Sequence, residues 1–110
     1  EFEFETENPD EFLALMFDLG FKQWMKKFKT SESYLHKKDK RLIIEINKVR
    51  HLGYFMEMEY LCEPKEIKKA KRKIMDALKE LEITKKDVDN VGYTKRLWDK
   101  GIKDKKYWVD

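Results

Sequence analysis

This sequence has few of the residues that would predict covalent cross-links or a membrane anchor. Cys62 is the only cysteine among 110 residues, so no disulfide can form within the chain, as is typical of proteins in a reducing compartment. No apolar run approaches the roughly 18 residues that a membrane-spanning helix requires, and no signal-peptide pattern is present. We therefore expect a cytoplasmic protein that has no membrane partner.

The common signatures of catalysis and nucleotide binding are also missing. The sequence contains no glycine-rich phosphate loop, no nucleophile elbow and no pairing of Cys with His. Its two histidines, His36 and His51, lack a second ligand at zinc spacing, which favours surface histidines. Only four glycines and two prolines are present, and this low content together with abundant Lys and Glu is typical of thermophilic proteins.

Charged residues make up 43% of the chain, but the two signs nearly balance. The 25 basic and 22 acidic residues give a net charge of +3, which argues against a dedicated nucleic-acid binder. A chain of 110 residues suffices for one domain, which we expect to span residues 1–110. The sequence begins with Glu1-Phe2 inside a strand pattern, so we expect this domain to be incomplete and an N-terminal half to precede it.

The most informative stretch is residues 51–60, with the sequence His-Leu-Gly-Tyr-Phe-Met-Glu-Met-Glu-Tyr. It predicts a turn at Gly53 and then a strand in which Glu57 and Glu59 share one face. Their Cα atoms would lie roughly 6–7 Å apart, and at an effective dielectric constant of about 20 the two charges would repel by roughly 2.5 kcal/mol. A bound divalent cation would relieve this repulsion in an enclosed site. On a solvated face the repulsion would matter little, and the residues alone leave both interpretations open.

Alternating polarity predicts three further strands, at residues 1–6, 22–36 and 41–49. The charged and polar face of each strand would carry, in order, Glu3 and Glu5, then Lys27 and Lys29, then Arg41, Glu45 and Asn47. Each pattern also has an explanation without a binding site. Charge on the first strand would protect an exposed sheet edge, and the lysines would form a solvated face.

Two helices and one short helix complete the prediction. Asn8 and Pro9 are typical of a helix start and Gly20 of its end, and this helix should bury the stripe Phe12, Leu15, Met16 and Leu19. A second helix should run from Pro64 to about residue 82, with a basic face that suits either exposure to solvent or binding to nucleic acid or lipid. Thr84 and Asp87 should cap the short helix, docked by Val91, Leu97 and Trp98.

The order strand, helix, three strands, two helices predicts an α+β fold with an antiparallel sheet, because short turns join the middle strands. The polar faces of the four strands would lie on one side of this sheet. The apolar faces would pack on the helices.

Five short motifs follow one another along the chain: Glu3-Phe4-Glu5, Asp18-Leu19-Gly20-Phe21, Lys27 with Lys29, Asn47-Lys48-Val49, and Leu52 to Glu59. This ordered set resembles the C-terminal half of a CYTH domain. The CYTH superfamily comprises triphosphate-tunnel proteins such as CyaB-type class IV adenylyl (adenylate) cyclases, thiamine triphosphatases and tripolyphosphatases. The resemblance runs from residue 1 to about residue 98.

The resemblance implies that the sheet forms half of a β-tunnel with helices packed on its outer face. It also implies a bound Mg²⁺ or Mn²⁺ with oxygen ligands: Glu57 and Glu59, helped by Asn47 or Glu45. Phosphate oxygens would meet Lys27, Lys29 and Arg41, with Glu3 and Glu5 as further tunnel-lining residues. The ligand would be a nucleoside or other organic triphosphate, or inorganic polyphosphate. ATP cyclisation and triphosphate hydrolysis are the reactions implied, and the residues do not distinguish between them.

Two positions depart from the family pattern. Ser31 stands where the family has arginine, which removes a bidentate phosphate ligand unless the register shifts so that Lys29 takes that place. Asn47 stands where the family has aspartate, which keeps an oxygen ligand but removes one charge. These departures favour an alternative, a non-catalytic module of the same fold that binds polyphosphate or another protein chain, including a second copy in a homodimer.

Overall fold

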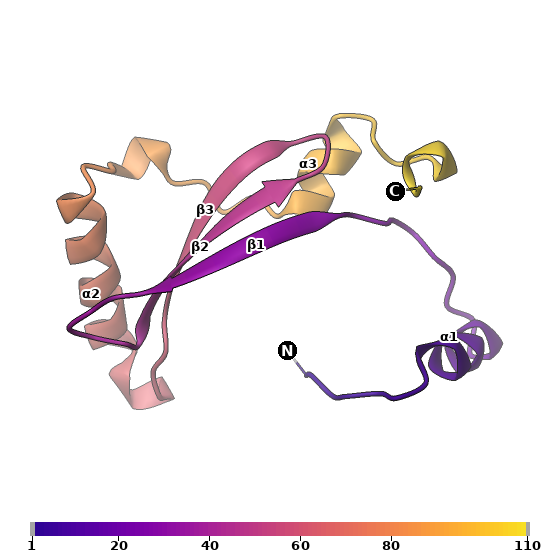
Figure 1. Ribbon diagram of the computed structural model, residues 1–110, viewed down its shortest axis with the longest axis horizontal. Helices are drawn as coiled ribbons and strands as arrows, with labels where there is room; N and C mark the ends of the chain where they lie inside the picture. Colours follow the sequence, from indigo (N-terminus) through magenta and orange to yellow (C-terminus); the bar gives the residue numbers. More distant parts are fainter. Residues whose placement is uncertain (1, 110) are drawn as a thin grey trace.

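The computed structural model describes residues 2–109 as an α+β fold, which confirms the predicted class (Figure 1). The main elements are α1 (Pro9–Asp18), β1 (Lys29–Leu35), β2 (Leu42–Val49), β3 (Gly53–Tyr60), α2 (Ile67–Glu80) and α3 (Tyr93–Asp99). Single-turn 3₁₀ helices lie at Pro64–Glu66, Lys85–Asp87 and Lys105–Tyr107. The three strands form one antiparallel sheet in the order β1-β2-β3.

The strand register gives the sheet two chemically different faces. Glu45 of β2 lies opposite Ser33 of β1 and Glu57 of β3, so these three side chains share a face. The polar face, as we define it, carries Lys29, Ser31, Ser33, Glu45, Asn47, Glu57 and Glu59. The apolar face carries Tyr34, Leu42, Ile44, Met58 and Tyr60. The face assignments predicted for β2 and β3 by alternation are thus confirmed between Leu42 and Tyr60.

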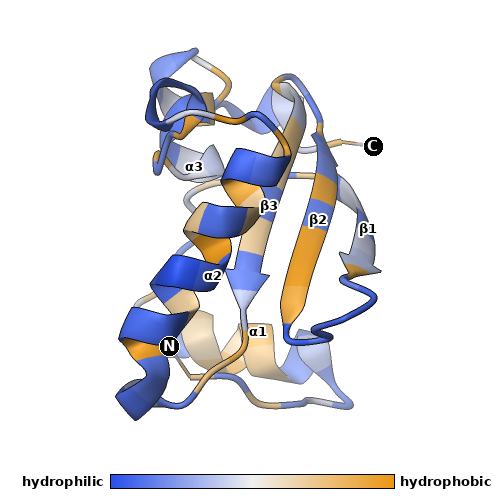
Figure 2. Cartoon of the chain, turned by 90° about the vertical axis from the view of Figure 1, so that its left-hand side faces the viewer, coloured by the Kyte–Doolittle hydropathy of each residue, from blue (hydrophilic) through white to orange (hydrophobic). Residues whose placement is uncertain are grey.

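Helix α2 packs on the apolar face and forms the main core with it. Ala70 of α2 is buried against Leu42 and Tyr60, and partly buried Met58 and Ile74 surround them. Burial of a leucine side chain contributes about 1.5–3 kcal/mol, so this cluster stabilises the packing of α2 on the sheet. Figure 2 shows α2 over β3, whereas β1 lies to one side of the helix. The lysines of α2 lie on its exposed side.

Helix α3 lies against the opposite, polar face. The ring of Tyr93 contacts Phe55 of β3 at a centroid distance of 5.1 Å, and Leu97 of α3 is buried. Leu97 docks a short helix as expected, but Trp98 and Val91 remain 41% and 40% exposed, and the helix begins at Tyr93 rather than after Thr84. The capping box between Thr84 and Asp87 is confirmed, although it begins only a 3₁₀ turn.

The predicted strand over residues 22–36 is too long. β1 begins only at Lys29, because its partner strand β2 ends at Val49, which is the residue opposite Lys29. One further backbone bond joins the Arg50 N–H to the Phe28 carbonyl oxygen at 2.9 Å, and the pairing stops there. Residues 22–28 therefore remain outside the sheet, with Lys27 among them.

We define residues 2–21 as the N-terminal arm, which lies apart from the sheet (Figure 1). Helix α1 begins and ends where predicted, and Gly20 terminates it with a φ of +95°. Two other expectations for the arm are wrong. Residues 2–6 form no strand, because they have no neighbouring strand among the described residues, and Glu1 lies outside those residues. The stripe expected in the core is not buried, since α1 contains no buried residue between Pro9 and Asp18.

The described chain is consequently open. Its radius of gyration is 17.6 Å, whereas a compact domain of this length has about 13 Å. It exposes 9,864 Å², roughly 3,300 Å² more than expected for a folded monomer of its mass. The sheet has three strands rather than the predicted four within residues 2–109. No helix in this range is both long and apolar enough to cross a bilayer.

Candidate functional site

A hydrogen-bonded network occupies the centre of the polar face. Asn47 of β2 is fully buried and joins the three elements around it. Its amide oxygen accepts a 2.5 Å bond from the Ser31 hydroxyl of β1. Its amide nitrogen donates to a Glu57 carboxylate oxygen of β3 at 3.1 Å and to the Tyr93 hydroxyl oxygen of α3 at 3.0 Å. Asn47 therefore holds both neighbouring strands and α3 in place, since an unpaired buried amide would be costly.

The phenol of Tyr93 connects this network to α3. Burial raises the pKa of Tyr93 above its ordinary value, and the nearby carboxylates of Glu57 and Glu45 raise it further. The hydrogen bond from Asn47 opposes this rise in pKa. Like any tyrosine, Tyr93 is protonated at neutral pH, so its hydroxyl group can both accept from Asn47 and donate a hydrogen bond. Lys29 lies beside it, with its Nζ 6.0 Å from the centre of the Tyr93 ring.

Carboxylates and cations meet on this face. Glu45 and Glu57 lie directly opposite each other across β2 and β3, and Lys29 Nζ lies 3.7 Å from a Glu45 oxygen. Glu59 shares the face but is exposed and lies opposite Ile43. The structure thus brings together Lys29, Glu45, Asn47 and Glu57 of the predicted site, with Glu59 one pleat away.

The predicted metal site fits these residues only in part. No group of three or more His, Cys, Asp or Glu side chains between residues 2 and 109 is placed to hold a metal ion. The oxygen of Asn47 already accepts from Ser31. Mg²⁺, however, is commonly bound by one or two carboxylates together with phosphate oxygens of the ligand. Glu45 and Glu57 are of the type that such a shared site requires.

A basic groove lies at the end of the sheet where β1 begins and β2 ends. It has a volume of about 570 Å³ and is lined by Lys27, Phe28, Lys29, Thr30, Lys48 and Arg50, with no carboxylate among the lining residues in the described chain. Lys27 Nζ donates to the Thr94 hydroxyl at 3.1 Å. The guanidinium of Arg50 lies 4.3 Å from the centre of the Phe28 ring. Four cations thus gather beside the polar face and favour an anionic ligand.

Arg41 lies elsewhere. Its guanidinium is 5.0 Å from the Tyr60 ring on the apolar face, and its Nη1 binds Glu66 at 3.1 Å. The expectation that Arg41 shares a face with Glu45 is therefore wrong. The reason is that Arg41 precedes β2 and its long side chain turns toward Tyr60 and Glu66. Asp39 completes this cluster with a 2.7 Å bond from the Tyr60 hydroxyl.

Glu3 and Glu5 also fail to line the polar face. Both belong to the N-terminal arm, which runs clear of the sheet (Figure 1). Successive side chains point to opposite faces only within a strand, and residues 2–6 are in no strand. The alternating sequence therefore does not place these two carboxylates on a common face of the sheet. Their predicted place beside the other carboxylates is therefore wrong in this arrangement of the chain.

Sequence reasoning missed three residues of this region. Lys48 and Arg50 line the groove, but alternation puts Lys48 on the face opposite Asn47, and Arg50 follows the end of β2. Their spacing of two was a usable signal, because it repeats that of Lys27 and Lys29. Tyr93 had no such signal, because only the packing of α3 brings it to Asn47.

Comparisons of this chain with protein-family models, with curated proteins and with solved structures found no match. The resemblance to CYTH domains therefore rests on the ordered motifs alone.

Proposed function

We propose that this chain binds the phosphate chain of an organic triphosphate, or inorganic polyphosphate, in its basic groove. The observation that carries the proposal is the gathering of Lys27, Lys29, Lys48 and Arg50 around one groove without a lining carboxylate among the described residues. Lysine ammonium groups bind phosphate as mobile point charges. The guanidinium of Arg50 donates from Nη1 to the Val109 carbonyl oxygen at 2.6 Å and would bind phosphate through its remaining N–H groups.

A divalent cation would accompany the ligand. Glu45 and Glu57 lie farther along the polar face, and Lys29 links them to the groove because it lines the groove and forms an ion pair with Glu45. Mg²⁺ or Mn²⁺ bridging these carboxylates and the phosphate oxygens would supply charge neutralisation along the phosphate chain. The protein groups would orient the ligand: the lysines at its phosphates and the carboxylates at its cation.

Conversion of the ligand is the further step that the CYTH resemblance implies. Cyclisation of ATP would use the ribose 3′-oxygen as nucleophile and hydrolysis would use water, in either case inside a β-tunnel of which this sheet is half. The saturated hydrogen bonds of Asn47 and the missing three-residue ligand cluster within residues 2–109 favour binding without conversion. Binding is therefore the function that we propose for this chain alone.

Isothermal titration with tripolyphosphate, with and without Mg²⁺, tests this proposal. The double variant Lys48→Ala/Arg50→Ala should weaken binding by at least about tenfold, because each charge-assisted hydrogen bond contributes about 1.5–3 kcal/mol. The matched control Lys68→Ala/Lys71→Ala removes two charges from exposed positions of α2 and should bind as the original chain does. Absence of binding, or equal weakening by both variants, would refute the groove as the site.

A separate assay addresses conversion. The chain is incubated with ATP and Mg²⁺ or Mn²⁺, and cyclic AMP, pyrophosphate and orthophosphate are measured. We expect no turnover above that of a Glu57→Gln variant. Turnover that Glu57→Gln abolishes would establish an enzyme and assign that carboxylate to the metal.

A further inference from the structure

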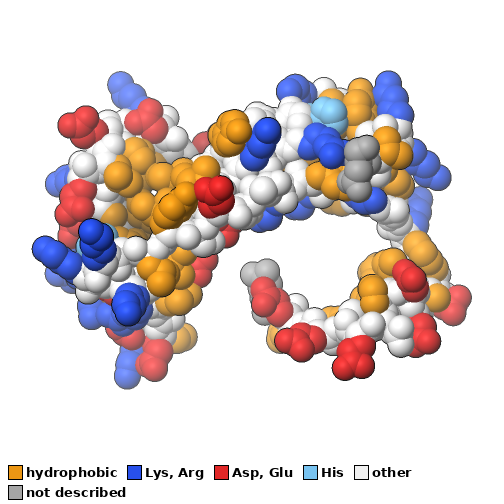
Figure 3. Space-filling model, viewed as in Figure 1, with side chains coloured by type: hydrophobic (Ala, Val, Ile, Leu, Met, Phe, Trp, Pro, Cys, Tyr) orange, Lys and Arg blue, Asp and Glu red, His pale blue; other side chains and the backbone are white. Residues whose placement is uncertain are grey.

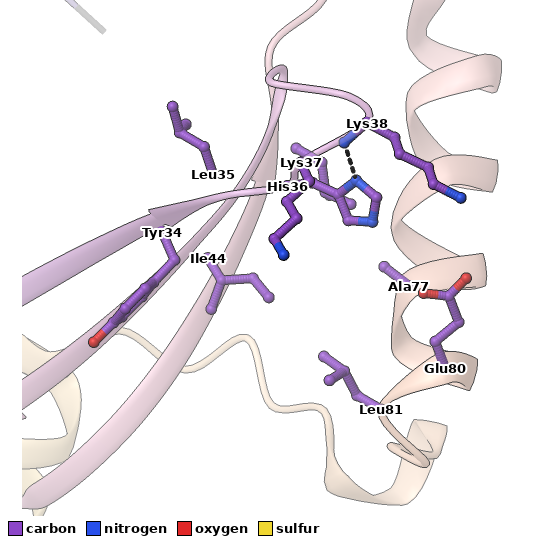
Figure 4. A pocket seen from close by; sticks show the side chains of 10 residues that line it. Tyr34, Leu35, His36, Lys37, Lys38, Ile44, Ala77, Glu80 and Leu81 are labelled. Atoms are coloured by element: carbon purple, nitrogen blue, oxygen red, sulfur yellow. Dashed lines mark hydrogen bonds between the residues drawn. The ribbon is translucent and has the colours of Figure 1, made fainter.

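An apolar groove lies on the apolar face where α2 does not cover the sheet. It has a volume of about 410 Å³ and is lined by Tyr34, Leu35, His36, Lys37, Lys38, Leu42, Ile44, Ala77, Glu80 and Leu81. Figure 4 shows Ile44 and Leu81 between the strand pair β1-β2 and the C-terminal half of α2, with Leu35 on the other side of β1. Two lysines, Lys37 and Lys38, and one carboxylate, Glu80, line it. The groove therefore suits an apolar segment, and its small net positive charge favours one that carries negative charge.

The N-terminal arm has this chemistry. Its residues include Phe4, Leu15 and Leu19, which are 68%, 52% and 67% exposed. All 25 basic residues follow Phe21, whereas seven of the 22 acidic residues precede it. Figure 3 shows the arm as an acidic segment with apolar patches, set off from a body rich in Lys and Arg. Charge and apolar surface both complement the groove.

The sheet has two exposed edges, β1 and β3, and the charges on them favour β1 as the place where the arm would pair. Residues 2–6 alternate Phe with Glu or Thr and could add as a strand, with phenylalanines toward the apolar face and glutamates toward the polar face. At β3 the glutamates would meet Glu57 and Glu59, which is unfavourable. At β1 they would meet Lys29, Ser31 and Ser33 instead. The β1 edge also borders the apolar groove, through Tyr34 and Leu35.

The exposed surface area is large enough for an interface with a second copy of the chain. The chain exposes roughly 3,300 Å² more than a compact monomer of its mass. A standard stable interface buries about 1,200–2,000 Å² in total. The area buried when each of two copies places its arm in the groove of the other would lie within this excess of exposed surface.

We propose that two copies of this chain form a dimer by exchanging N-terminal arms. Residues 2–6 of one copy pair with the β1 edge of the other, and α1 seats its stripe of Phe12, Leu15, Met16 and Leu19 in the apolar groove beside α2. The exchange is reciprocal, as a two-fold axis requires. The apolar groove lies at the opposite end of β1 from the basic groove, and the two proposals meet at Lys29, which lines the basic groove and lies on the edge where the arm would pair.

Sedimentation velocity across micromolar chain concentrations is the first test. The expected mass is twice the 13.5 kDa of one chain. Leu15→Glu should weaken dimerisation by at least about tenfold, because it places a charge in the apolar groove. Ala14→Glu adds the same charge on the opposite face of α1 and should leave the dimer intact. A monomeric original chain, or a dimer that Leu15→Glu does not weaken, would overturn the proposal.

Cysteine cross-linking distinguishes exchange from an arm that folds back on its own chain. Leu15→Cys and Leu81→Cys are combined in a Cys62→Ser background and oxidised in dilute solution. Exchange gives covalent dimers on a denaturing gel, whereas a bond within one chain, or no bond, contradicts it. Far-UV circular dichroism of each variant verifies that the sheet and helices remain folded.

Discussion

Asn47 connects three elements through hydrogen bonds at a position where the sequence suggested a metal ligand. All of its polar atoms are engaged, by Ser31 on one side and by Glu57 and Tyr93 on the other. Because the residue is fully buried, each of these bonds is worth more than it would be in water. The amide is needed here since only it can donate to Glu57 and accept from Ser31 at once.

Replacement of this amide by a carboxylate should be costly. Asn47→Asp removes the N–H donors and places a second negative charge about 3 Å from Glu57, so we expect a loss of about 2–4 kcal/mol in unfolding free energy. Urea denaturation measures it, with the exposed Asn90→Asp as the control. Millimolar Mg²⁺ should recover part of the loss if this face binds a cation with Glu57. A fully stable Asn47→Asp would show that the network is not structural.

Asp39 makes stability depend on pH in the acid range. The hydrogen bond from the Tyr60 hydroxyl lowers the pKa of Asp39, and the Arg41 backbone N–H and the charges of Arg41 and Lys73 lower it further. Because the folded pKa lies below the unfolded value of about 3.9, this stabilisation is complete above that value. It is lost as the pH falls through the folded pKa.

Tyr60→Phe removes the main cause of that lowered pKa. The variant should melt below the original chain at neutral pH, and the difference in Tm should shrink as the pH falls below about 4. Thermal melts between pH 2 and 7 measure it, with Tyr54→Phe as a control on an exposed ring. A difference that stays constant over this range would contradict the coupling of Tyr60 to Asp39.

At the scale of elements, α1 and α2 have similar apolar spacing but different environments. α2 packs Ala70 against Leu42 and Tyr60, whereas α1 has no buried residue between Pro9 and Asp18. An amphipathic helix is stabilised mainly by burial of its apolar face. The β2-α2 cluster should therefore hold most of the stability of the isolated chain.

Leu42→Ala tests this division. Truncation of this buried leucine should lower the unfolding free energy by about 2–4 kcal/mol, from lost burial and the cavity left behind. Leu61→Ala, one residue past β3 and 49% exposed, should change it by less than about 0.5 kcal/mol. Equal effects in urea denaturation would place the core elsewhere.

For the whole molecule, charge is segregated along the chain. Residues 1–20 contain seven acidic and no basic side chains, so the rest of the chain carries a net charge of about +10. This polarity gives the body an affinity for anions, and the arm carries a net negative charge. Phosphate binding and arm exchange thus draw on the same excess of cations, and both involve Lys29.

Removal of residues 1–20 separates the two effects. The shortened chain should still unfold cooperatively, because no residue of α1 is buried, and tripolyphosphate should bind at least as tightly and with steeper salt dependence. It should also lose the concentration dependence of Tm that a dimer shows. Calorimetry at two chain concentrations, followed by titration, measures both. Loss of cooperative unfolding would mean that the arm belongs to the core.

The sequence alone predicted correctly those features that depend only on neighbouring residues, such as turns and the faces of a strand. Gly20 and Gly53, both at positive φ, mark boundaries that were predicted correctly, and alternation assigned Glu45, Asn47 and Glu57 to one face. The tertiary structure alone decided which patterned segments found a partner. Residues 2–6 have the alternation of a strand but lack a neighbour to pair with among the described residues.

The direction and partners of several side chains were also decided by the tertiary structure and not by the local sequence. Arg41 binds Glu66, and Asn47 is a buried residue that connects three elements. Lys48 and Arg50 lie beside Lys29 of β1 and the preceding Lys27, because β1 and β2 pair in the sheet. The sequence by itself determined the helices, the turns and the two-faced strands, since those depend on backbone propensity and periodicity within a few residues. Only the tertiary structure determined burial and the partners of each charge, because these depend on atoms that the chain brings together from far along its length.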